Sequence, residues 1–181
     1  MVDDRVEIIE ALARYARALE SRDGETLATL FAPDGKVEVF SRYGSEEYES
    51  QDVDVNGREQ IRGMLAKGNM PPGRGMSYMT TDHIVEITGD VARLQAQFLV
   101  MSSVAKPRPD GGWPSGAELM QGALSLIMIG HYESLLRKSG GQWLFTCHRV
   151  KHSLPMSRRV AAWRTDNVSH PPAIAMAFAP D

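Results

Sequence analysis

The sequence contains a single cysteine, Cys147, among its 181 residues. One cysteine excludes a disulfide within the chain, and it is typical of proteins from a reducing compartment. It also excludes metal sites built from clustered cysteines. We therefore expect a cytoplasmic location.

Long apolar runs are also missing. The longest one, near LSLIMI at 124–129, is too short to cross a bilayer, and the acidic, amphipathic start MVDDRVEIIE does not have the pattern of a secretory signal. Positive charge is not in excess, because 20 Lys and Arg stand against 23 Asp and Glu and the net charge is -3. This balance argues against nucleic acid or an anionic membrane as the main partner. With no glycine-rich phosphate loop and no dinucleotide fingerprint, we expect no cofactor.

The first part of the chain carries helical patterns. Apolar residues recur at helical spacing over residues 3–21, which predicts an amphipathic helix. Asp23 is placed to cap a second, short helix that Pro33 stops. A strand is expected at 36–40, followed by a polar loop over 41–55.

A third helix is expected after residue 56. Asn56 with Glu59 three residues later resembles a capping box, and Ile61, Met64 and Leu65 give this helix one apolar face.

Strand patterns dominate after residue 76. Residues 76–87 and 91–102 alternate in polarity around a turn at Gly89-Asp90, which predicts a hairpin. A long, curved strand is expected over 118–137, with a kink at Gly122 or Gly130, and the last strand over 142–153. Helices first and strands last predict an α+β domain. We expect three helices packed in the concave side of a strongly bent, mainly antiparallel sheet, with an apolar pocket between them.

Four stretches resemble one known family in their order and gaps. They are ALARYARALESRDGETLATLFAPDGKVEV, NGREQIRGML, TTDHIVEITGDVARLQAQFLV and GHYESLLRKSGGQWLFTCHRV. Over about residues 5–152 the chain resembles the SnoaL-like branch of the NTF2-like superfamily. The resemblance implies an NTF2-like cone over residues 1–155, with 156–181 as an irregular tail of the same domain. The fold hosts dehydratases, a dehydrochlorinase, isomerases and plain binding domains, so it does not decide the function.

The resemblance suggests a catalytic pair. In the dehydratase and dehydrochlorinase relatives, a carboxylate near the end of the first helix orients a histidine on the strand before the hairpin. The matching residues here are Glu20 and His83. Strand alternation places His83 on the same face as Val85, so we predict that it lies in the pocket and acts as a general base. The other possibilities are a histidine hydrogen-bonded to backbone, a solvated Glu20, and Asp23 as the partner, although a helix cap explains Asp23 better.

Two more residues are candidates for the site. Tyr15 falls on the apolar side of the first helix, where relatives have a pocket tyrosine; its hydroxyl could steady an oxyanion, or it could be an ordinary core aromatic. His148 falls near a pocket arginine of the dehydrochlorinase relative. Alternation puts His148 and His152 on one strand face, with Trp143, Phe145 and Cys147 on the other.

Other chemistries have less support. The isomerase relative has its base where this chain has Val39, and the adjacent Glu38 should point to the opposite face. The place of His131 is left open by the kink expected at Gly130. The histidine spacings do not form a metal motif, so we expect no metal.

Two functions remain open. The first is a cofactor-independent lyase of the dehydratase type, or an isomerase, acting on a bulky apolar, aromatic or steroid-like small molecule. The second is a non-catalytic binding or assembly domain of the same fold. Ten methionines fit an apolar ligand, although core filling also explains them. An apolar outer sheet face predicts a homodimer or homotrimer, with Trp143, Phe145 and Trp163 as candidate contacts.

Overall fold

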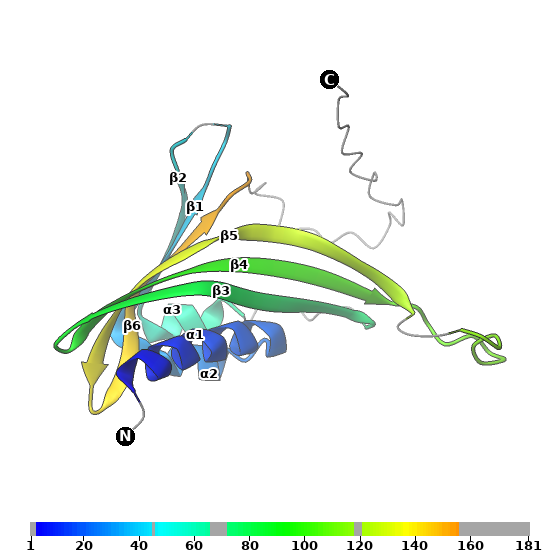
Figure 1. The fold of residues 1–181 in the computed structure, drawn as a ribbon, viewed down its shortest axis with the longest axis horizontal. Coiled ribbons are helices and arrows are strands. Elements are labelled where there is room, and N and C mark those ends of the chain that lie inside the picture. The colour runs from blue at the N-terminus through cyan, green and yellow to red at the C-terminus, as the bar shows by residue number, and fades with distance from the viewer. Residues whose placement is uncertain (1–2, 45, 66–71, 118–120, 156–181) are drawn as a thin grey trace.

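The computed structural model describes residues 3–44, 46–65, 72–117 and 121–155 (Figure 1). These residues form three helices and six strands, in the order α1 (Asp4–Ser21), α2 (Gly24–Thr29), β1 (Phe31–Ser41), β2 (Glu49–Asn56), α3 (Gly57–Gly63), β3 (Arg74–Thr88), β4 (Val91–Ala105), β5 (Gly122–Ser139) and β6 (Gln142–His152). The strands make one sheet in the order β2-β1-β6-β5-β4-β3. Among these neighbours β1 and β6 run parallel, and the other pairs run antiparallel. The helices lie together under the concave side of the arched sheet, which confirms the expected α+β architecture.

Helix α1 forms where the periodicity predicts it. The Asp3 carboxylate caps its start by accepting a hydrogen bond from the backbone N–H of Arg5, at 3.0 Å. Its end is marked by Arg22, whose φ of 56° is in the left-handed region. The helix buries one stripe, formed by Ile8, Ala11, Leu12, Tyr15, Ala16 and Ala18. This stripe holds α1 against the sheet.

The two faces of the sheet differ in composition. The inner face, toward the helices, carries the core residues of β4 (Ala92, Leu94, Ala96, Phe98 and Val100), together with Tyr132, Leu136 and Phe145. The outer face carries the residues between them, such as Arg93, Gln95 and Gln97. Each strand therefore alternates between core and surface, as period-two patterning requires.

Irregularities in the pairing change which residues reach each face. Between Thr81 and Ile84, strand β3 has two residues opposite one of β4, and Asp82 within this bulge has a φ of 54°. A second bulge, between Leu135 and Leu136 of β5, leaves Thr146 of β6 as the extra residue. A bulge of this kind shifts the alternation by one residue.

The second bulge makes one sequence prediction wrong. Trp143 and Phe145 do not lie opposite His148; all three are buried, and Phe145 and His148 both contact Tyr15 on the inner face. The extra residue at Thr146 lets positions 145 and 148 share a face. Trp143 and Phe145 are therefore core residues and not candidates for subunit contact. Trp163 lies outside the described residues.

The prediction of a loop over 41–55 is also wrong in its second half. Residues Glu49–Asn56 form strand β2, which pairs with β1. Strand β1 begins at Phe31, earlier than expected, and Pro33 lies within it, where the pairing with β6 is irregular. Asn56 precedes α3 but its side chain makes no cap; instead its backbone N–H donates to Oε1 of Gln60, so the box with Glu59 is not formed.

A crowded glycine lies at the centre of the inner face. A Cβ built on Gly130 would come 2.1 Å from the carbonyl oxygen of Lys151 and 2.7 Å from the ring of Phe98. Phe98 in turn stacks on Tyr132, with ring centroids 4.4 Å apart. Glycine at position 130 thus lets the backbone at Lys151 and the ring of Phe98 come close. This packing explains the glycine without the kink that the sequence predicted.

We predict that Gly130→Ala lowers the free energy of unfolding by about 1–3 kcal/mol, because backbone and an aromatic ring must move to admit the methyl group. Urea unfolding followed by circular dichroism measures the loss. Gly111→Ala is the matched control, since a Cβ there meets nothing within 4 Å. Equal effects of the two substitutions would contradict the packing account.

Candidate functional site

Tyr15 is the centre of an aromatic cluster between α1 and the inner face of the sheet. Its ring centroid lies 4.3 Å from that of His148, 5.9 Å from that of Tyr132, and 6.2 Å from that of Phe145. Its exposed fraction is 2%. The structure therefore brings two predicted site residues, Tyr15 and His148, into contact.

His148 is fully buried and neutral. Its Nδ1 shares a 2.8 Å hydrogen bond with the Ser134 hydroxyl, and its Nε2 is buried without a hydrogen-bond partner among the described residues. Burial lowers the pKa of His148 to about 3. At neutral pH this imidazole is therefore uncharged and a poor base.

Three tyrosines lie near one another on this side of the sheet. Burial raises the pKa of Tyr15, Tyr78 and Tyr132, and the proximity of Tyr78 raises the pKa of the other two further. Their hydroxyls therefore keep their protons across the physiological range and can donate hydrogen bonds. Tyr78 and Tyr132 were missed in the sequence, although the alternation of Met76, Tyr78 and Thr80 places Tyr78 on the inner face.

Glu20 lies at the end of α1 and contacts strand β3. Its Oε1 accepts a 2.8 Å hydrogen bond from the backbone N–H of Tyr78. Strand β3 is an edge of the described sheet, so this carboxylate satisfies a donor that has no strand to pair with. It thereby ties the helix end to the sheet.

His83 is one of the two β3 residues in the bulge, next to Asp82. It is half-buried, and its Nε2 shares a 3.0 Å hydrogen bond with Oγ1 of Thr80. Thr80 pairs with the core residue Phe98, which places this contact on the inner face, as the alternation predicts. Among the described residues no hydrogen bond or ion pair joins His83 to Glu20. The His83 ring contacts the side chain of Thr80, and the Glu20 carboxylate contacts the backbone of Tyr78, two residues earlier on β3.

The other acidic candidates have structural partners. Asp23 caps α2 by accepting from the backbone N–H of Thr26 at 2.9 Å, as expected. Glu38 is on the outer face, also as expected, where Arg149 donates to it at 2.6 Å and Lys36 is also bound. These cations, Lys36 first, lower the pKa of Glu38 to about 2.

The two remaining described histidines lie on opposite faces. His152 is buried on the inner face with its ring 5.5 Å from that of Phe98, and burial lowers its pKa. His131 is exposed on the outer face. Within the described part of the chain, no three His, Cys, Asp or Glu side chains gather as metal ligands would.

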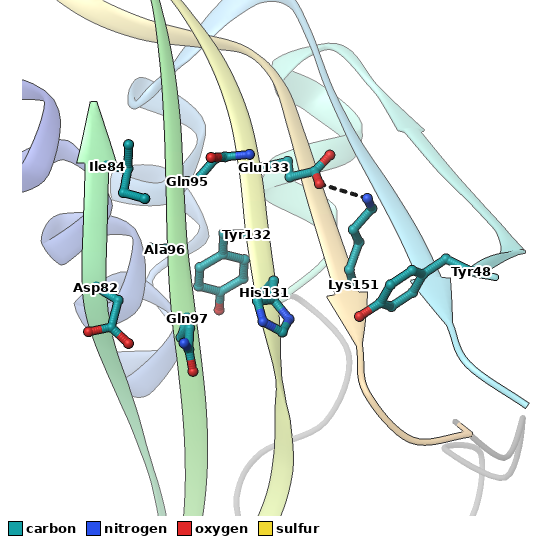
Figure 2. A pocket seen from close by; sticks show the side chains of 10 residues that line it. All are labelled: Tyr48, Asp82, Ile84, Gln95, Ala96, Gln97, His131, Tyr132, Glu133 and Lys151. Carbon is teal, nitrogen blue, oxygen red and sulfur yellow. Dashed lines mark hydrogen bonds and ion pairs between the residues drawn. The ribbon is translucent and has the colours of Figure 1, made fainter. Parts of the chain in front are cut away.

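A groove of about 390 Å³ lies on the outer face (Figure 2). Its lining includes Tyr48, Asp82, Gln97, His131 and Lys151, and Lys151 is paired with Glu133 at 2.7 Å. None of the four predicted site residues lines this groove. The candidate site on the inner face and the groove are thus on opposite sides of the sheet.

The comparisons with known proteins agree with this fold. A family model described as "SnoaL-like domain" matches residues 1–149. No curated protein matches the sequence. In the described parts of the chain, no helix has the length and apolar character needed to cross a membrane.

Several solved structures are similar. A protein of unknown function from Mycobacterium tuberculosis is 22% identical, with a TM-score of 0.59, over 90% of this chain and 79% of that one. A protein from Novosphingobium aromaticivorans with the provisional name scytalone dehydratase is 20% identical, with a TM-score of 0.60, over 87% and 89%. From the same organism, the beta subunit of a provisionally named aromatic-ring-hydroxylating dioxygenase is 15% identical, with a TM-score of 0.61, over 84% and 90%. At these identities the likeness establishes the fold alone, which other neighbours describe as NTF2-like and cystatin-like.

The buried His148 predicts a pH dependence of stability. Its pKa is about 3 in the folded chain against 6.5 for an ordinary histidine, so between these values the unfolded state binds a proton that the folded state does not. Stability must therefore fall as the pH drops from 6.5 toward 3. Between about pH 7.5 and 4.5, we expect His148 to contribute a loss of roughly 2–3 kcal/mol.

Urea unfolding of the native chain and of His148→Gln at both pH values measures this contribution. The variant, which retains a polar group for Ser134, should lose less stability on acidification. Equal losses in the two proteins, or titration of the His148 ring near pH 6 in NMR spectra of the native chain, would contradict the assignment.

Proposed function

The chain belongs to the SnoaL-like domain family, and from this premise we propose that it is a cofactor-independent lyase of the dehydratase type, or an isomerase. The substrate is a bulky apolar, aromatic or steroid-like small molecule, bound between α1 and the inner face of the sheet. The provisional name of the scytalone dehydratase neighbour is in line with this proposal. The observation that carries it is the half-buried His83 on the inner face, whose one hydrogen-bond partner among the described residues is the Thr80 hydroxyl.

His83 is the proposed base. When Nε2–H donates to Oγ1 of Thr80, Nδ1 carries the free lone pair and can take a proton from carbon. The Thr80 hydroxyl then holds the ring orientation. This is the orienting role that the family resemblance implied for Glu20. In the proposal, Glu20 acts instead through the backbone of Tyr78, as a positioning residue.

The tyrosines and His148 supply polarity without charge. Tyr15 and Tyr78 keep their hydroxyl protons and can donate to an oxygen that gains negative charge as the proton leaves. Nε2 of His148 has no hydrogen-bond partner among the described residues, and we propose it as one more contact for a substrate oxygen. Donors fixed in a buried site stabilise such charge more strongly than water does.

In a dehydration, His83 takes the proton next to a substrate carbonyl, and the C–H electrons form an enolate held by a tyrosine hydroxyl. The enolate electrons then form the C=C bond as the β-hydroxyl leaves. That hydroxyl takes the proton back from the imidazolium and departs as water. In an isomerisation the imidazolium returns the proton to another carbon.

A non-catalytic binding domain is the second candidate. It is favoured by the hydrogen bond of Glu20, because a carboxylate bound to the Tyr78 N–H does not contact the His83 ring to stabilise an imidazolium. In that case the inner-face residues only shape a ligand site. Turnover distinguishes the two candidates.

The experiment starts from hydroxylated polycyclic and steroid ketones that raise the melting temperature of the protein. For a compound that turns over, we predict that His83→Ala lowers kcat by about 10²- to 10⁴-fold, the usual contribution of a general base. His131→Ala, on the exposed outer face, is the control and should keep full activity.

Glu20→Gln should cost less than tenfold, because the amide oxygen can still accept from the Tyr78 N–H. Compounds that bind native chain and His83→Ala alike, with no turnover by either, would favour the binding domain. Full turnover by a folded His83→Ala would exclude His83 as the base.

A further inference from the structure

The first half of β5, near the connection from β4, carries exposed apolar side chains. Leu124 and Leu126 each have 58% of their surface exposed, and Ile129 has 37%. Strand pairing sets them beside apolar residues of β4 and β3, namely Leu99, Met101 and Met79. A contiguous exposed apolar patch of this kind indicates a surface that another segment covers.

The same stretch of β5 is an open edge of the sheet. Strand β5 pairs with β4 along its length, but its pairing with β6 begins only at Gly130. Among the described residues, 122–128 therefore have a strand on one side and none on the other, and Figure 1 shows this part of β5 at the border of the sheet. Backbone groups along such an edge can pair with an added strand.

The described part of the chain ends beside this edge. The backbone N–H of Ser153 donates to the carbonyl oxygen of Ile129 at 2.9 Å, and Pro155 is the last residue that the structure describes. From Pro155, about 18 residues lead to Ala173, and at about 3.3 Å per residue they can span up to roughly 60 Å. The open edge is only about 23 Å long at this rise, so the chain after Ala173 can reach all of it.

Residues 173–179 have the sequence of a strand. They read AIAMAFA, in which Ile174, Met176 and Phe178 alternate with alanines and no residue is charged. In an extended chain the three large side chains share one face and the alanines share the other. Prolines bound the run on both sides, as is typical of a short strand.

We propose that residues 173–179 add as a strand to the open edge of β5 in the same chain. The large side chains then lie beside Leu124 and Leu126 on the outer face, and the alanines lie beside Ala123 and Ser125 on the other face. Main-chain hydrogen bonds satisfy the edge, and apolar pairs between neighbouring strands add to them.

The tether favours the segment of the same chain over any other strand. A flexible linker gives its segment an effective concentration on the order of millimolar, far above the concentration of a second chain in micromolar solution. An apolar edge left open would invite pairing between chains and aggregation. The added strand therefore protects the edge.

A disulfide tests the proposal in the full chain. Leu126→Cys and Met176→Cys are combined with Cys147→Ser, which removes the native thiol. Opposed residues of neighbouring strands have Cβ atoms about 4.5–5.5 Å apart, close enough for mild oxidation to join such cysteines. We expect a disulfide within one 20.0 kDa chain on a non-reducing gel.

Arg93→Cys with Met176→Cys, in the same Cys147→Ser background, is the matched control. Arg93 is exposed on the outer face but lies far along β4 from the patch, so this pair should cross-link at least tenfold more slowly. Equal rates for the two pairs, or a disulfide that mainly joins two chains, would overturn the proposal.

Hydrogen exchange measured by mass spectrometry tests the strand itself. Met176→Pro removes a backbone donor in the middle of the added strand, so exchange over residues 122–128 should become about tenfold faster or more. Asn167→Pro, which lies outside the segment, should leave this exchange as in the native chain. Equally fast exchange in the native chain and both variants would show that the edge stays open and would refute the added strand.

Discussion

The packing of Tyr15 against the inner face of the sheet is the contact on which the rest of the structure depends. One side chain of α1 touches β5 through Tyr132 and β6 through Phe145 and His148, and its ring also lies near Phe31 of β1. This contact fixes the helix over the sheet, and with it the place where the helix ends. Because the helix ends beside β3, Glu20 can reach the backbone of Tyr78.

The two bulges determine which side chains lie on each face of the sheet. The bulge in β3 turns Asp82 toward the outer groove while its neighbour His83 stays on the inner face with Thr80. The extra residue at Thr146 brings His148 inward together with Phe145. Two irregular positions thus separate the inner face, with its buried aromatic cluster, from a charged outer face.

Much of the fold could be predicted from local patterns, and the failures have physical causes. Helix α1 was predicted from the helical spacing of its apolar residues, and the β3–β4 hairpin from alternating polarity around the turn residues Gly89 and Asp90. Strand β2 was missed because Glu49–Asn56 is polar and pairs on one side only, so it buries little. The inner position of His83 followed from alternation, but the role of Glu20 did not, because the hydrogen bond to Tyr78 joins residues 58 positions apart. The sequence also could not predict that Phe145 and His148 share a face, because no residue type marks the bulge at Thr146.

The proposed chemistry requires that ligands bind on the inner face, within reach of His83. The most direct measurement is a crystal structure with a polycyclic ketone that raises the melting temperature of the protein. The account predicts the ligand between α1 and the sheet, with its oxygen within about 3 Å of a tyrosine hydroxyl or Nε2 of His148 and an acidic carbon facing His83. A ligand seated in the outer groove of Figure 2, with the inner face unchanged, would contradict it.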